Sequence, residues 1–176
     1  MAAQFVTIGH SDRSLDEFLD MLRAAGVGMV IDVRAFPRSR SNPAYNIDQL
    51  PEELARVQIG YRHMVALGGR RPKQPGVPES LNALWRVQSF HNYADYALGD
   101  EFAEAFRELA RLGRDQRPAL MCAEAVWWRC HRRTIADHLL LDGHPVEHLM
   151  APGQSEGATP TPGVLKDALG RVVYPA

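Results

Sequence analysis

Short apolar runs alternate with amphipathic segments of helical period over most of the chain, and this alternation constrains the fold more than any other feature. The runs typical of strands are residues 5–10, 29–34, 60–64, 118–123 and 145–150. The run at 29–34 begins with a continuous apolar stretch, which is typical of a strand covered on both faces. Strands that alternate with helices form a mainly parallel sheet with right-handed crossovers. We therefore expect an α/β fold of three layers, with a sheet of about five strands flanked by helices.

Four segments predict the helices of these layers: residues 14–25, about 51–57, about 93–112 and 132–141. Ser14 caps the first of them with Glu17 as its capping-box partner, and Gly26 ends it. Gly99 and Asp100 mark a point at which the third helix can divide into two pieces.

The length of 176 residues matches the usual size of one domain. We expect a single α/β domain over residues 1–150, followed by a linker at 151–163 that is rich in Gly, Pro, Ser and Thr. Residues 164–176 are expected to form a C-terminal extension that packs on the domain, as a small hairpin or as a partial helix with a strand. Neither the strand order nor the oligomeric state follows from the sequence.

Composition excludes several classes of function. No apolar run approaches the roughly 18 residues that a membrane-spanning helix needs, and the N-terminal residues lack the pattern of a signal peptide. With only two cysteines, a disulfide-stapled extracellular scaffold is not expected, and we predict a cytoplasmic protein without a membrane partner. The net charge of −1 provides no general attraction to nucleic acid or to an anionic membrane.

Polar side chains follow four consecutive predicted strands. The segments are GHSDR, DVRAFPRSRSNP, LGGRR and CAEAVWWRCHRR, in chain order. In parallel sheets, ligands bind beyond the carboxyl ends of the strands, where these loops gather. We therefore expect a site at this edge, with Gly9, His10 and Ser11 forming one wall of it.

These segments resemble the family named domain of unknown function 488. The resemblance runs through TIGHSDRSLDEFLDML, DVRAFPRSRSNPAYN, YRHMVALGGRR, WRVQSFHNYADYA with EFAEAF, and MCAEAVWWRCHRRTIADHL, and so covers most of residues 5–150. It implies a compact three-layer α/β domain. It implies no activity, because the function of that family is unassigned.

Cys122 is a candidate nucleophile because it ends a strand and precedes a loop and the start of a helix. Loop amides and the helix end would lower the pKa of its thiol. The alternative is a buried structural cysteine, since free cysteine is often buried. We expect Cys122 to be largely shielded. Cys130 lies beside His131 and two arginines, where positive charge and helix amides would favour its thiolate.

We expect neither a disulfide nor a metal ion between the two cysteines. A reducing cytoplasm opposes the disulfide, which in addition requires Cα atoms within about 7 Å of each other. Zinc requires four close N or S ligands, and two cysteines eight residues apart with one adjacent histidine match this poorly.

Arginines cluster on three of the loops at the predicted edge. They are Arg34, Arg38 and Arg40 on the first, Arg70 and Arg71 on the second, and Arg129, Arg132 and Arg133 on the third. Guanidinium groups bind phosphates and carboxylates in a bidentate manner, and a helix start at Cys130 and His131 adds amide donors. For Arg34 the alternative is an ion pair with buried Asp32 or with Glu124.

Aromatic residues accompany the arginines and could stack on bases, although each also fits a packing role. They are Phe36, Tyr45, Trp85, Tyr93, Trp127 and Trp128. The long loop at 67–90 is either functional or disordered, and Trp85 and Phe90 favour a packed loop. The set indicates a nucleotide or polynucleotide ligand more than an inorganic ion.

Asp32 and Glu124 follow two apolar strands and form a candidate acid/base pair. The alternative is that they anchor Arg34 and Arg129 and hold the loops rigid.

Two functions remain open. The favoured one is an enzyme that acts on a phosphorylated or nucleotide-like anionic substrate; the other is a non-catalytic module that binds nucleic acid through arginine and aromatic loops. The candidate catalytic residues are Cys122, Glu124 and Asp32. The candidate substrate-binding residues are His10, Ser11, Arg34, Arg38, Arg40, Tyr93, Arg129, Cys130, His131 and Arg132. A small anionic ligand is the expected partner, and no cofactor is expected.

Overall fold

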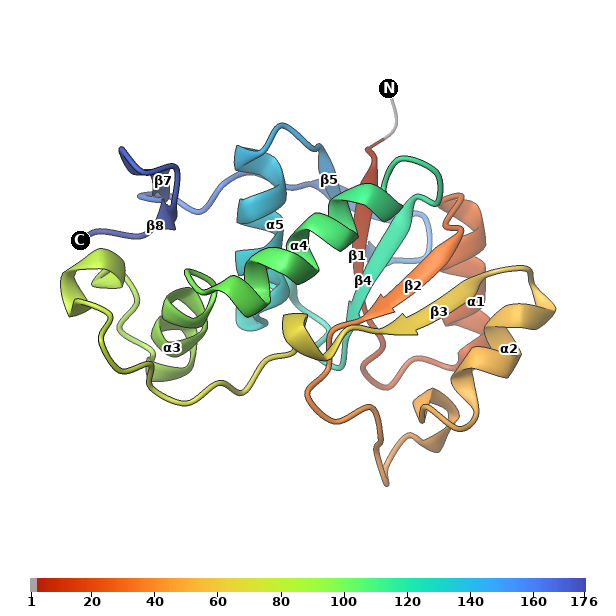
Figure 1. Ribbon diagram of the computed structural model, residues 1–176. Coiled ribbons are helices and arrows are strands. Elements are labelled where there is room, and N and C mark those ends of the chain that lie inside the picture. Colours follow the sequence, from red (N-terminus) through yellow and green to blue (C-terminus); the bar gives the residue numbers. More distant parts are fainter. Residues whose placement is uncertain (1–2) are drawn as a thin grey trace.

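The computed structural model describes residues 3–176, and its central feature is a six-stranded sheet. The strands are β1 (Phe5–Gly9), β2 (Met29–Asp32), β3 (Gly60–His63), β4 (Pro118–Cys122), β5 (Val146–Ala151) and β6 (Gln154–Gly157). Their order is β3-β2-β4-β1-β5-β6, and every neighbouring pair is parallel except β5 and β6 (Figure 1). The prediction of an α/β fold with a mainly parallel sheet is confirmed, and β6 is the strand that the sequence pattern missed.

Five α-helices and four short 3-10 helices connect the strands. The α-helices are α1 (Leu15–Ala24), α2 (Leu50–Arg56), α3 (Gln88–Tyr96), α4 (Asp100–Leu112) and α5 (Arg132–Leu141). The 3-10 helices are η1 (Pro43–Tyr45), η2 (Val65–Leu67), η3 (Glu79–Asn82) and η4 (Trp127–Arg129). Ser14 caps α1 by accepting a hydrogen bond from the backbone N–H of Glu17 at 3.1 Å, and the predicted division of the third helix is the break between α3 and α4. Within residues 3–176, no helix is both long and apolar enough to cross a membrane.

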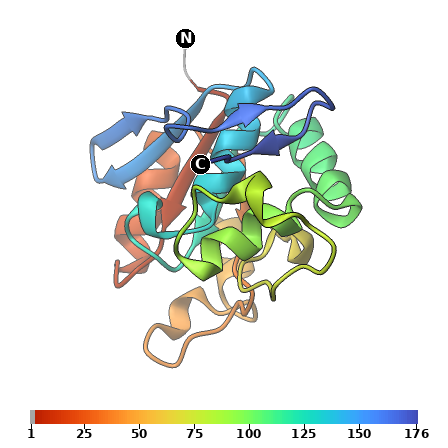
Figure 2. The same ribbon diagram turned by 90° about the vertical axis from the view of Figure 1, so that its left-hand side faces the viewer.

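The sheet carries one apolar core on each face, because successive residues of a strand point to opposite sides. On β4, Ala119 and Met121 pack with α1 and α2, whereas Leu120 and Cys122 pack with α3, α4 and α5. Figures 1 and 2 show these two sets of helices on opposite sides of the strands. Helices on both faces explain why the strands read as continuous apolar runs.

The strand order reverses direction around β4. From β1 the chain moves past β4 to β2 and then to the edge strand β3, and from β4 it moves past β1 to β5. Crevices form outside the carboxyl ends of parallel strands where the order reverses in this way. The ends of β1, β2 and β4 therefore border the position at which a ligand site is expected.

The C-terminal residues pack against α5. Within the segment expected to be a linker, residues 154–157 form β6, whose four side chains are all exposed. Beyond it, β7 (Leu165–Lys166) and β8 (Val172–Val173) form a small hairpin. The Tyr174 side chain that follows is fully buried and donates a hydrogen bond to Asp137 of α5 at 2.7 Å.

Candidate functional site

A cavity of about 590 Å³ lies at the carboxyl ends of β1, β2 and β4. Its lining includes nine of the thirteen residues predicted for the site: His10, Arg34, Arg38, Tyr93, Cys122, Glu124, Arg129, Cys130 and His131. The other four, Ser11, Asp32, Arg40 and Arg132, lie outside this lining. Segments far apart in the sequence thus meet where the strand-end argument predicts.

Asp32 is fully buried at the end of β2 and holds Arg34 in place. Its Oδ1 accepts hydrogen bonds from the Nε and the backbone N–H of Arg34 at 2.9 and 3.0 Å. Its Oδ2 accepts one from an Nη of Arg34 at 2.7 Å and one from the hydroxyl of Tyr61. Because both oxygens are occupied, the structure favours an anchoring role for Asp32 over acid/base chemistry.

Arg34 lines the cavity, and one of its side-chain donors has no partner within residues 3–176. Four of its five side-chain N–H groups are used, two by Asp32, one by the carbonyl of Tyr45 at 2.7 Å and one by His10. Burial opposes the charge, but the hydrogen bonds and negative charge of Asp32 outweigh it and raise the pKa of Arg34. One N–H of a permanently charged group is therefore available to an anion.

His10 is fixed in one neutral tautomer. Arg34 can only donate, so Nε2 of His10 accepts at 3.3 Å, and Nδ1 carries the proton that it donates to the carbonyl of Ser11 at 2.9 Å. Burial, together with the nearby Arg34, lowers the pKa of His10 although the bond to Ser11 opposes this. The ring stacks on Tyr45 with centroids 4.4 Å apart. His10 thus forms a rigid wall of the cavity.

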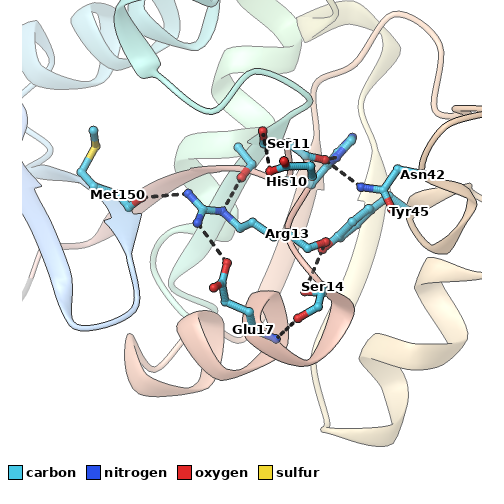
Figure 3. Close-up of polar contacts among 10 residues, drawn as sticks. His10, Ser11, Arg13, Ser14, Glu17, Asn42, Tyr45 and Met150 are labelled. Atoms are coloured by element: carbon cyan, nitrogen blue, oxygen red, sulfur yellow. Dashed lines mark hydrogen bonds and ion pairs between the residues drawn. The ribbon is translucent and has the colours of Figure 1, made fainter.

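The turn after β1 is held by side chains that donate hydrogen bonds to backbone carbonyls, as Figure 3 shows. Ser11 adopts a positive φ of 46°, and its carbonyl also accepts from Nδ2 of Asn42 at 2.7 Å. Arg13 donates to the carbonyls of Gly9 and Met150 at 2.9 and 2.8 Å. Ser11 therefore shapes the wall through its backbone, and its side chain lies outside the cavity lining.

The two cysteines lie side by side in the cavity wall. Cys122, at the end of β4, is 3 % exposed, and Cys130, two residues before α5, is 6 % exposed. Both thiols are free, and both residues belong to the same apolar cluster and line the same cavity. The shielding predicted for Cys122 is observed.

The pKa values of the two thiols shift in opposite directions, downward at Cys122 as its strand-end position suggested, and upward at Cys130, where a stabilised thiolate was expected. Burial opposes ionisation of Cys122, but a hydrogen bond from Cys130, the charge of Arg132 and the backbone of Glu124 together lower the pKa of Cys122 below its ordinary value. Burial and the neighbouring Cys122 raise the pKa of Cys130 well above its ordinary value. The nearby positive charge thus favours the thiolate of Cys122 and does not overcome the burial of Cys130.

Arg132 lies behind the cavity wall, with 1 % of its surface exposed. It donates to the hydroxyl of Thr7 at 3.1 Å and to the carbonyls of Glu124 and Ala125, each at 3.0 Å. These contacts join the loop after β4 to α5 and to β1. Arg132 was predicted to bind substrate, and its position favours a role in holding the loop that carries Glu124.

His131 is a neutral hydrogen-bonding residue between the loops. Its Nε2 donates to the carbonyl of Val33 at 2.7 Å, so the unprotonated Nδ1 faces the sulfur of Cys130 at 3.6 Å. Burial and the charge of Arg132 lower the pKa of His131 to about 4. Gly69 packs directly on this ring, because a Cβ there would lie 2.8 Å from Nδ1.

Some charged side chains at the cavity rim have partners, and others form no ion pair. Arg38 pairs with Asp48 at 3.0 Å in an exposed ion pair, and Arg70 lies over the ring of Phe36 at 5.4 Å. Arg129 and Glu124 are exposed, and neither side chain forms an ion pair within residues 3–176. The other arginines of the three loops serve elsewhere: Arg40 is exposed outside the lining, Arg71 lies over Tyr96, and Arg133 lies between Trp85 and Trp127.

Most of the aromatic residues proposed for stacking are packed in the fold. Tyr45 and Tyr93 are buried, Trp85 stacks on Phe90 and Trp127 stacks on His148. Tyr93 lines the cavity, but its hydroxyl donates to the carbonyl of Leu67 at 2.7 Å. The large exposed rings are those of Phe36, at 67 %, and Trp128, at 43 %, and Phe36 lies in the cavity lining.

Eight further residues line the cavity and were absent from the predicted set: Ala35, Phe36, Ser39, Gly69, Arg70, Ser89, Phe90 and Ala123. Four of them lie in the segment 67–90 that was predicted as a long loop, and of these Ser89 and Phe90 belong to the first turn of α3. The length and aromatic content of this segment were the available signal. Gly9 is a further determinant, because a Cβ there would lie 1.8 Å from the carbonyl oxygen of Glu124. No sequence signal distinguishes this close approach from an ordinary turn glycine.

The fold and the cavity define a class: an α/β protein with a thiol and several arginines at the carboxyl edge of a parallel sheet. The family model described as Domain of unknown function DUF488 matches residues 14–139, so the chain belongs to this family, as the resemblance predicted. Searches of curated proteins and of solved structures found no significant match. Within residues 3–176, no group of three or more His, Cys, Asp or Glu side chains is arranged to hold a metal ion.

Proposed function

We propose that the protein is an enzyme that acts on a phosphorylated or nucleotide-like anionic substrate, with Cys122 as its nucleophile. The observation that carries the proposal is a buried cation without an acidic partner. Arg132 forms no ion pair with a carboxylate of residues 3–176, and its Nε has no hydrogen-bond partner there.

A buried charge is unfavourable unless an opposite charge lies nearby. The Cys122 thiol is an ionisable group close to Arg132, and this guanidinium lowers its pKa. An ionised Cys122 would therefore compensate the charge of Arg132, and a thiolate is the reactive form of cysteine. The arrangement favours a nucleophilic over a purely structural Cys122.

The substrate anion would be bound by groups that face the same cavity. Arg34 has one N–H left after its contacts with Asp32, Tyr45 and His10, and the guanidinium of Arg129 is exposed at the rim. Guanidinium groups match the geometry of phosphate oxygens, and a hydrogen bond to a charged group contributes about 1.5–3 kcal/mol. A cavity of about 590 Å³ is within the size range of small-molecule sites.

Glu124 is the remaining candidate for acid/base chemistry. Glu124 lines the cavity and is exposed, whereas both oxygens of Asp32 are occupied. We assign to Glu124 the role of a general base that activates water to cleave a covalent intermediate on Cys122.

The test combines turnover with ligand binding. The protein is incubated with a panel of aryl phosphates and nucleoside mono- and diphosphates, and phosphate release is measured for wild type, Cys122→Ser and Glu124→Gln. We expect release with at least one member of the panel, its loss in Cys122→Ser and a large decrease in Glu124→Gln. Absence of turnover over the whole panel, or full activity in Cys122→Ser, contradicts the proposal.

Arg129→Ala supplies the binding test, and Arg114→Ala is its matched control. Arg114 is also exposed, but it lies before β4, at the opposite edge of the sheet. In thermal-shift titrations we expect Arg129→Ala to weaken binding of the phosphate-bearing ligand at least about tenfold, because a charge-assisted hydrogen bond is lost. Arg114→Ala should bind as wild type does.

Binding of nucleic acid without catalysis is the alternative function, and the exposed ring of Phe36 at the cavity rim is the observation in its favour. A single-stranded oligonucleotide is therefore included in the titrations. Binding to the oligonucleotide that Phe36→Ala weakens, without turnover of any phosphate ester, would support this alternative. For either function we propose a cytoplasmic location, where both thiols stay reduced.

A further inference from the structure

The shared position of Cys122 and Cys130 in one apolar cluster of the cavity wall suggests a reaction of the pair that does not require the substrate. The two thiols line the same cavity from different elements, one at the end of β4 and the other just before α5. No other cysteine exists in the chain. A buried pair of this kind can react with a small molecule that enters the cavity.

The contacts of the two sulfurs differ. The sulfur of Cys130 lies 3.6 Å from the unprotonated Nδ1 of His131 and accepts the backbone N–H of Arg132 at 3.5 Å. Its S–H therefore has two acceptors, His131 and the sulfur of Cys122. The sulfur of Cys122 instead lies near the charge of Arg132 and at the cavity surface. These contacts assign to Cys122 the role of the attacking sulfur and to Cys130 that of the thiol that keeps its proton.

We propose that Cys122 and Cys130 form a reversible disulfide when a hydroperoxide enters the cavity. The thiolate of Cys122 attacks one oxygen of the hydroperoxide, the O–O bond breaks, and the leaving alkoxide or hydroxide takes up a proton. Cys122 becomes a sulfenic acid. The sulfur of Cys130 then attacks the sulfur of Cys122, an S–S bond forms, and water leaves with the proton of Cys130. The hydroperoxide is reduced by two electrons, and the two thiols are oxidised to one disulfide.

The cavity suits this reaction on two counts. It admits a molecule as small as hydrogen peroxide to an otherwise shielded thiol, and Arg34 lines the same space with one unused N–H that can stabilise the departing oxygen. The unprotonated Nδ1 of His131 lies 3.6 Å from the sulfur of Cys130 and can orient its thiol by accepting a hydrogen bond before the second step. The disulfide would block the nucleophile of the proposed function and protect it from further oxidation.

The test uses the full-length protein, reduced and then exposed to a small excess of hydrogen peroxide, followed by intact-mass analysis. Wild type should lose the mass of two hydrogens, and dithiothreitol should restore it. Cys130→Ser should stop at a sulfenic acid that dimedone traps, and Cys122→Ser should gain no dimedone adduct. Circular dichroism of each variant establishes that it is folded before the result is scored.

Three results would overturn the inference: a dimedone-trapped sulfenic acid that persists in wild type, direct oxidation of Cys122 to the sulfinic acid, or no reaction of Cys122. The inference uses the nucleophile of the proposed function, but the two can fail separately. Disulfide formation without turnover of any phosphate ester would contradict only the proposed class of substrate. Turnover without disulfide formation would contradict only the proposed reaction with hydroperoxide.

Discussion

Replacing Gly9 by alanine tests directly how the loop after β4 packs against the end of β1. The last residue of β1 lies against the loop after β4, and a Cβ on Gly9 would lie 1.8 Å from the carbonyl oxygen of Glu124 and 2.6 Å from its carbonyl carbon. Real Cβ contacts to backbone atoms essentially never fall below 3.0 Å, so this carbonyl must move by about 1 Å or more. The obstacle is backbone and cannot be relieved by a side-chain rotation.

The displaced carbonyl accepts a hydrogen bond from Arg132 at 3.0 Å and one from the thiol of Cys122 at 3.5 Å. Overpacking of this kind destabilises a protein by about 1–3 kcal/mol. For a chain of 176 residues we expect the melting temperature of Gly9→Ala to fall by roughly 2–10 °C. The movement also takes away a carbonyl that accepts a hydrogen bond from the thiol of Cys122 and so stabilises the neutral thiol, and alkylation of Cys122 by iodoacetamide at neutral pH should become faster.

Gly157→Ala is the matched control, because a Cβ at that position in β6 meets no atom within 4 Å and its φ is not positive. Differential scanning fluorimetry and alkylation followed by mass spectrometry measure the two effects. If Gly9→Ala melts and alkylates as Gly157→Ala does, the packing of the β4 loop on β1 is not as described.

Three further predictions concern the stability of the fold. Asp32→Asn should lower the free energy of unfolding by about 3–5 kcal/mol in urea titrations, because it leaves the charge of Arg34 buried without a carboxylate. Tyr61→Phe should lower it by only about 1 kcal/mol. Equal effects of the two substitutions would refute the anchoring role of Asp32. Burial lowers the pKa of His138 to about 4, so between pH 6.5 and pH 4 the unfolded chain binds a proton there that the folded chain does not. Stability should therefore fall as pH falls through this window, by up to about 1.4 kcal/mol per pH unit for this histidine, and His138→Leu should flatten the pH profile; an unchanged slope would contradict this. Ser14→Ala should reduce stability by about 1 kcal/mol through loss of the α1 cap, and an unchanged urea midpoint would argue against that cap.

The α/β class could be predicted because helices cover both faces of the sheet. Residues of β4 that point to opposite sides, such as Ala119 and Leu120, are both buried, so the run is continuously apolar and easy to recognise. The strand β6 gave no such signal. Its four residues are exposed and pair with β5 through the backbone alone, and a hydrophobic pattern cannot reveal pairing of that kind.

The position of the candidate site could also be predicted, but the roles of individual side chains could not. Three arginine loops at one edge follow from the parallel sheet. Which arginine faces the cavity depends on packing: Arg132 turns inward to the β4 loop and Arg71 lies on Tyr96, whereas Arg129 remains at the rim. Spacing along the chain contains no information about these directions.

The two cysteines show why local sequence misleads about ionisation. Cys130 has His131 and Arg132 as its sequence neighbours, which predicts a stabilised thiolate. In the fold, His131 is neutral, Cys130 is buried beside another sulfur, and burial outweighs the charge of Arg132. Cys122 has no charged sequence neighbour on its strand, yet the fold brings Arg132 to it from α5.

The ionisation of Cys122 is the central claim, and thiolate absorbance near 240 nm measures it most directly. The protein is titrated with pH as Cys130→Ser, which leaves one thiol and keeps a hydroxyl donor beside it, and as the same variant with Arg132→Met. We predict that Cys122 titrates with a midpoint below the ordinary cysteine pKa of 9.0, and that Arg132→Met shifts the midpoint upward. A midpoint at or above 9.0, or one that Arg132→Met leaves unchanged, would contradict an arginine-stabilised nucleophile in this cavity.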